Sequence, residues 1–125
     1  MLTKVLSRVN SLILAVFCTL FILVLSLVNQ VPQPADITVN DKFGHLVAYL
    51  FLTFFWLIFA TYSTKNKTNL LLVAIACIFY GIVIELLQHA LTSTRTASVL
   101  DVLANTLGVF IAYFLVFVVK IKVKN

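Results

Sequence analysis

The sequence has few charged residues. Of its 125 residues only 10% are Asp, Glu, Lys or Arg, whereas a soluble domain carries about 25%. Hydrophobic residues make up 62%, and the mean hydropathy is +1.13. Because so few polar groups cannot cover a surface that faces water, this composition excludes an ordinary soluble domain and indicates a surface in contact with lipid.

Cysteine and proline are also scarce, with two residues of each. Cys18 and Cys77 both fall inside apolar segments, so we expect no disulfide and interpret both as small packing residues. Pro32 and Pro34 lie together in the polar segment 29–41. Since proline opposes continuation of a helix, this segment is expected to be a loop between two helices.

Four long apolar runs occupy nearly the whole chain. A bilayer core of about 30 Å requires about 20 apolar residues in a helix, and the runs cover about residues 12–28, 43–62, 70–91 and 99–119. The first run is interpreted as a membrane anchor, because it is long and no signal-peptidase site of the Ala-x-Ala type follows it. The sequence therefore predicts an all-α integral membrane protein, a four-transmembrane-helix bundle forming a single domain over residues 1–125.

The basic residues predict the orientation of this bundle. With the N-terminus in the cytoplasm, two basic residues lie outside, Lys42 and Arg95, and seven lie inside: Lys4, Arg8, Lys65, Lys67, Lys120, Lys122 and Lys124. This asymmetry follows the positive-inside rule, so both termini are expected to be cytoplasmic. The net charge of +5 then requires no nucleic-acid partner, since anionic inner-leaflet lipid is a sufficient partner.

Acidic and imidazole groups gather in the outer half of the predicted bundle. At 1.5 Å per residue, His45 lies about 6 Å below Asp41, and Asn105 lies about 6 Å below Asp101. Glu85 lies about 9 Å below the outer end of its helix. Three helices thus bring polar groups to one level, where burying a charge costs at least about 2.5 kcal/mol. Intramembrane ionisable residues are candidate functional residues for this reason.

The polar positions share helix faces with small residues. Residues three or four apart lie on one side of a helix, which places Gly81 beside Glu85, and Gly108 and Ala112 below Asn105. Small residues allow close helix contact in membranes. We therefore expect Gly81, Gly108 and Ala112 to pack helices together, and the polar side chains to face the interior of the bundle.

These polar residues carry a resemblance to a known family. Asp41-Lys42-x-x-His45-x-x-x-Tyr49 opens the second run, Glu85-Leu86-Leu87-Gln88 closes the third, and Asp101-Val102-Leu103-Ala104-Asn105-x-x-Gly108 follows the loop that contains Arg95. In this order, on a four-span chain, the sequence resembles the VanZ-like family over about residues 41–112. It departs from the family at Ala112, where relatives often have a second glycine, and alanine preserves the small-residue character.

The resemblance implies a bacterial cytoplasmic-membrane protein. The founding member of the family is associated with resistance to the lipoglycopeptide teicoplanin, by a mechanism that is not established. The sequence leads us to expect an outward-facing pocket that binds or modifies an envelope lipid or surface molecule. The expected lining residues are Asp41, His45, Tyr49, Glu85, Gln88, Arg95, Asp101 and Asn105.

Each of these residues also has a plainer interpretation. Asp41 and Asp101 can cap helix N-termini, while His45 and Asn105 can form hydrogen bonds between helices that fix their register. Arg95 can pair with an acidic residue of the bundle or bind a phosphate or carboxylate outside the membrane. A structural bundle whose polar cluster only fixes packing is therefore one alternative function. Transport is another, although four spans provide no obvious pathway without oligomerisation.

An intramembrane enzyme acting on a lipid-linked phosphate is the remaining alternative, with Glu85 or His45 as general acid or base. No serine, threonine or cysteine has the sequence neighbours that typically mark a catalytic nucleophile. Several side chains are of metal-ligating types, but no tight zinc spacing such as His-Glu-x-x-His occurs. The sequence therefore predicts no metal site and no cofactor, and it leaves the oligomeric state open.

Overall fold

The computed structural model describes residues 8–27, 38–63, 67–91 and 99–124 of the chain, with side chains for 8–27, 42–62, 69–91 and 99–119. The described residues form helices α2 (Arg8–Leu27), α3 (Thr38–Ser63), α4 (Lys67–Leu91) and α5 (Val99–Lys124). The fold is therefore entirely helical over the residues that the structure describes.

All four helices are long and apolar enough to cross a membrane. The candidate spans are Arg8–Leu27, Lys42–Tyr62, Asn69–Leu91 and Val99–Val119, which confirms the predicted all-α bundle of four transmembrane helices. The first span begins at Arg8, about four residues earlier than the apolar run alone indicated, because the helix continues through the polar residues that precede the run. The cytoplasmic location of the termini stays a prediction.

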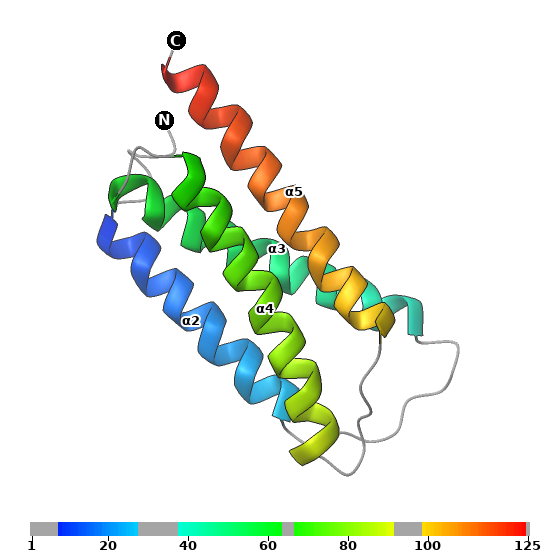
Figure 1. The fold of residues 1–125 in the computed structure, drawn as a ribbon. Helices are drawn as coiled ribbons and strands as arrows, with labels where there is room; N and C mark the ends of the chain where they lie inside the picture. Colours follow the sequence, from blue (N-terminus) through cyan, green and yellow to red (C-terminus); the bar gives the residue numbers. More distant parts are fainter. Residues whose placement is uncertain (1–7, 28–37, 64–66, 92–98, 125) are drawn as a thin grey trace.

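The helices run alternately up and down the bundle (Figure 1). The beginning of α2, the end of α3, the beginning of α4 and the end of α5 lie at one end, and the opposite ends of the helices gather at the other. Helix α3 contacts each of the other three helices, most extensively α5. It is therefore the central helix, against which α2, α4 and α5 pack.

The distribution of side chains is the reverse of that in a soluble bundle. Large apolar side chains such as Phe17, Phe79 and Phe114 are more than half exposed, whereas Gln88 and Asn105 are 1% exposed. In a bilayer, lipid covers the exposed apolar side chains, and polar groups are directed inward, where they can be paired. The burial pattern thus agrees with a membrane-embedded bundle.

Helices α3 and α5 approach each other closely at Gly108. A Cβ atom added to Gly108 would lie 2.3 Å from the carbonyl oxygen of Leu46 and 3.0 Å from the backbone nitrogen of Leu50. A side chain at this position would therefore collide with backbone, which cannot rotate away. Ala112, one turn further along α5, is completely buried and continues the same contact surface of small residues.

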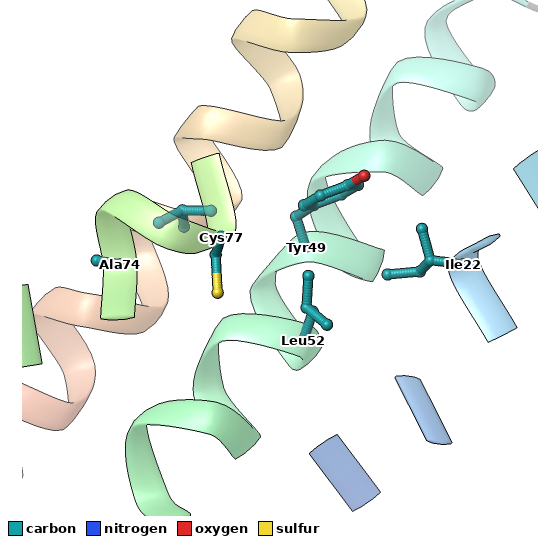
Figure 2. Packing of buried hydrophobic residues seen from close by; sticks show 6 residues of the cluster. Ile22, Tyr49, Leu52, Ala74 and Cys77 are labelled. Carbon is teal, nitrogen blue, oxygen red and sulfur yellow. The ribbon is translucent and has the colours of Figure 1, made fainter. Parts of the chain in front are cut away.

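The apolar core of the bundle has two parts. The first contains Ile22, Tyr49, Leu52, Ala74, Cys77 and Val109, contributed by all four helices, and Figure 2 shows how side chains of α2, α3 and α4 meet there. The second lies nearer the other end of the bundle and consists of Leu57, Ile58, Ala60, Leu70 and Val116. Together they hold α3 between its three neighbours.

Polar contacts also fasten α2 to the bundle. The indole nitrogen of Trp56 donates a hydrogen bond to Thr19 Oγ1 over 2.9 Å, and the Tyr80 hydroxyl donates to the Thr19 carbonyl oxygen over 2.6 Å. Thr19 Oγ1 in turn donates to the carbonyl of Ala15. A single residue of α2 thus binds both α3 and α4, which the sequence pattern did not indicate.

The close approach at Gly108 leads to a stability prediction. Gly108→Ala should lower the stability of the protein in detergent by about 1–3 kcal/mol, the usual cost of overpacking, because the added methyl group overlaps the Leu46 carbonyl. Gly44→Ala is the matched control, since nothing lies within 4 Å of a Cβ at that position and alanine is the better helix former. Equal midpoints of thermal unfolding for the two variants would contradict this packing.

Candidate functional site

Three helices bring ionisable side chains together near one end of the bundle. His45 on α3, Glu85 on α4 and Asp101 on α5 each place one nitrogen or oxygen atom within 4.8 Å of the other two. Glu85 and Asp101 are buried, and His45 is partly buried. These three residues, called the triad cluster below, lie at one level because Asp101 begins α5, His45 lies early in α3 and Glu85 lies late in the antiparallel α4.

A lysine neutralises part of the acidic charge of the triad cluster. Lys42 Nζ forms an ion pair and a hydrogen bond with Asp101 Oδ1. The side chain of Lys42 is 29% exposed and that of Asp101 is 10% exposed, so the pair lies at the edge of the cluster. This pairing was not predicted from the sequence, although Lys42 precedes His45 by three residues and therefore shares its helix face.

An amide holds the imidazole of His45 in place. His45 Nδ1 lies 3.1 Å from Asn105 Oδ1, and His45 Nε2 lies 3.7 Å from Asp101 Oδ2. Because an amide oxygen only accepts hydrogen bonds, Nδ1 is the donor in this arrangement. The ring nitrogen that faces the carboxylate of Asp101 is consequently Nε2.

Below the triad cluster lies a layer formed by Tyr49, Gly81 and Asn105. A Cβ on Gly81 would meet Tyr49 Cε1 at 3.1 Å and Asn105 Nδ2 at 3.3 Å, so both side chains pack directly against the glycine. Tyr49 and Asn105 are 1% exposed. The Tyr49 hydroxyl and Asn105 Nδ2 have no hydrogen-bond partner among the described residues, which leaves two buried donors next to the triad cluster.

Gln88 binds α2. Its Nε2 donates a hydrogen bond to the carbonyl oxygen of Ser26 over 3.0 Å, and this contact is buried. Gln88 therefore links the C-terminal part of α4 to the end of α2, in addition to any part it takes in the pocket expected from the sequence.

Two expected pocket residues lie outside what the structure describes. Asp41 belongs to α3, but its side chain is not among those described, and Arg95 lies in the undescribed segment 92–98. His89, the second histidine of the chain, is exposed on α4 and does not belong to the triad cluster.

An apolar pocket lies deeper in the bundle, between α2 and α4 and against α3. It has a volume of about 250 Å³, and its surface is almost entirely apolar. The lining residues are Thr19, Leu52, Trp56, Val73, Ala76, Cys77 and Tyr80. Cys77 precedes Glu85 by eight residues, so this pocket lies about 12 Å further along α4 than the triad cluster.

The two sites differ in the chemistry that they offer. The triad cluster and Lys42 provide an imidazole, two carboxylates and an ammonium group, which can bind polar groups and transfer protons. The deeper pocket offers contact with hydrocarbon side chains. Its one lining residue from α2, Thr19, accepts hydrogen bonds from Trp56 and Tyr80. An amphipathic ligand matches this division.

A family model described as VanZ/LLP1 matches residues 6–120. No curated protein and no solved structure matches the chain.

The ion pair at the edge of the triad cluster can be tested by a double-mutant cycle. In chelator-containing buffer, Asp101→Asn should destabilise the protein by about 1–3 kcal/mol, because it leaves the partly buried Lys42 ammonium without its carboxylate. Adding Lys42→Met should recover part of this loss, with a coupling free energy of about 1 kcal/mol. His89→Gln, an exposed control, should change stability by less than about 0.5 kcal/mol. Purely additive effects of the two substitutions in unfolding titrations would mean that the pair contributes nothing.

Proposed function

The chain belongs to the VanZ/LLP1 family, and from this premise we propose that it binds or modifies a cell-envelope lipid in the bacterial cytoplasmic membrane. The triad cluster would hold the polar headgroup, and the apolar pocket would hold part of an acyl chain. Both lie in one chain of four membrane-type helices.

The observation that carries this proposal is the spacing between a buried polar cluster and an apolar pocket. Half of a hydrocarbon core is about 15 Å thick. A lipid whose headgroup reaches the triad cluster therefore extends its chains to the depth of the pocket, about 12 Å further along α4. A small water-soluble ligand bound at the triad cluster would leave the pocket lined by Leu52, Val73 and Cys77 unfilled.

The groups around the triad cluster indicate an oxygen-rich headgroup, such as a phosphate ester. Lys42 supplies a positive charge, and the Tyr49 hydroxyl and Asn105 Nδ2 are buried donors without an acceptor among the described residues. His45 and Glu85 are the proton-transferring groups if the lipid is modified rather than only held. Through the resemblance to the founding VanZ protein, we include a contribution to teicoplanin resistance in the proposal.

The proposal requires the triad cluster to face the outside of the cell. In a variant without Cys18 and Cys77, a cysteine introduced as Ser93→Cys should react with a membrane-impermeant maleimide in intact cells. A cysteine introduced as Asn66→Cys should react only after the cells are permeabilised, because the adjacent Lys65 and Lys67 are expected inside. The opposite labelling pattern would place the cluster at the cytoplasmic surface and overturn the outward orientation.

Lipid binding is tested by measuring the lipid that is retained on the purified protein by native mass spectrometry. Ala76→Phe should fill the pocket and reduce retention about tenfold, equivalent to about 1.4 kcal/mol. Ile75→Phe is the matched control, because Ile75 is half exposed on the same helix and does not line the pocket. Asp101→Asn should reduce retention of the lipid class that binds the wild type, whereas His89→Gln should not.

The structural alternative makes a different prediction for the same variants. If the polar cluster only joins helices, Asp101→Asn and Glu85→Gln should lose stability while the variant protein that remains folded retains lipid normally. Retention that follows the folded fraction alone would therefore overturn the proposed binding function. Turnover of the retained lipid by the wild type, abolished in Glu85→Gln at unchanged retention, would assign modification rather than binding.

A further inference from the structure

We propose that His45, Glu85 and Asp101 form a binding site for one divalent cation of the Zn²⁺ or Mn²⁺ class. The inference goes beyond the proposed lipid function and does not depend on it, because cation binding can be measured without lipid. No spacing motif in the sequence indicates this site, since its three ligands come from three different helices.

The geometry of the ligand atoms is the first argument. Ligands about 2.0–2.2 Å from a tetrahedral ion, or adjacent ligands of an octahedral ion, lie about 2.8–3.6 Å from one another. His45 Nε2 and Asp101 Oδ2 are 3.7 Å apart, and one ligand atom from each of His45, Glu85 and Asp101 lies within 4.8 Å of the other two. The three side chains therefore lie close to the separations that the ligands of a common ion require.

The orientation of His45 is the second, independent argument. Its Nδ1 lies 3.1 Å from Asn105 Oδ1 and donates to it, so in a neutral imidazole Nε2 carries the lone pair, 3.7 Å from Asp101 Oδ2. The distance of 3.7 Å between these two atoms is too long for an N–H···O hydrogen bond, and a cation between them would contact both. Metal-bound histidines typically have this arrangement, in which the second ring nitrogen donates to an oxygen that fixes the tautomer.

The balance of charge is the third argument. Two carboxylates and a neutral imidazole around a divalent ion form a site with no net charge, which suits a membrane interior where net charge is costly. Lys42 brings one positive charge to a cluster that contains two carboxylates. A divalent ion can neutralise both carboxylates.

Lys42 acts as a competitor in this scheme. Its ammonium group holds Asp101 Oδ1, but the side chain is long, flexible and 29% exposed, so it can leave when the ion enters. The cation then takes the place of Lys42 at the carboxylate. This competition distinguishes a cation site from a cluster that only joins α3 to α5. In a cluster of the second kind, Lys42 would only stabilise the bundle.

The donor set indicates the class of ion. One imidazole with two carboxylates suits Zn²⁺ or Mn²⁺, while Mg²⁺ and Ca²⁺ favour all-oxygen sites and Cu(I) favours sulfur. Cys77 lies about 12 Å along α4 from Glu85, outside ligand range. Three protein ligands leave at least one position open, as in catalytic zinc sites, and an oxygen atom of a bound molecule can occupy that position.

The test measures binding of Zn²⁺ and Mn²⁺ to the purified full-length protein after removal of metal with a chelator. The expected result is one ion per chain, with an imidazole nitrogen bound to Mn²⁺ in pulsed electron paramagnetic resonance spectra. His45→Gln should abolish the nitrogen signal and weaken binding at least about tenfold. His89→Gln, which removes the exposed histidine, should preserve both. A signal that depends on His89 instead would reveal a surface ion and overturn the proposal.

Two further variants distinguish ligation from general stability. Asn105→Ala should weaken binding about 10–100-fold while one ion still binds, because the fixed tautomer of His45 is lost. Lys42→Met should tighten binding about fivefold, the equivalent of a partly exposed ion pair, since the competitor for Asp101 is gone. A destabilised bundle would bind less tightly, not more, so weaker binding by Lys42→Met overturns the proposal. So does a wild-type protein that binds no more metal than His45→Gln.

Discussion

The contact between α3 and α5 at Gly108 is the constraint on which the arrangement of the candidate site depends. With no side chain on Gly108, the Leu46 carbonyl lies where a Cβ would be, and the two helix backbones touch. This contact sets the register that places Lys42 and His45 on α3 opposite Asp101 and Asn105 on α5. A wider separation would leave His45 out of hydrogen-bond reach of Asn105.

The bilayer explains why such a cluster is buried at all. In a soluble bundle, acidic groups would move to the surface, but here the surface is apolar, with side chains such as Phe79 and Phe110 directed outward. Ionisable groups must therefore be paired inside or lie near an aqueous end. The triad cluster does both, since it lies near one end of the bundle, its members lie within 4.8 Å of one another, and Asp101 pairs with Lys42.

The candidate site was predictable in its members but not in its connections. The convergence of His45, Glu85 and Asp101 follows from helical rise and from depth in antiparallel helices, both of which can be read from the sequence. The contact of Gln88 with Ser26 and the pairing of Lys42 with Asp101 were not predictable. Each depends on how a helix is rotated against its neighbour, and a uniformly apolar helix carries little information about its rotation.

The sequence by itself determined the class of protein, the four membrane helices and the level at which polar groups gather. These properties depend on composition, the length of apolar runs and distance along a helix, which are local quantities. Only the tertiary structure decided which nitrogen of His45 faces Asp101, which acidic group Lys42 neutralises, and that an apolar pocket lies beneath the cluster. Those features depend on helix rotation and separation, which arise from the packing of glycine and other small residues between helices.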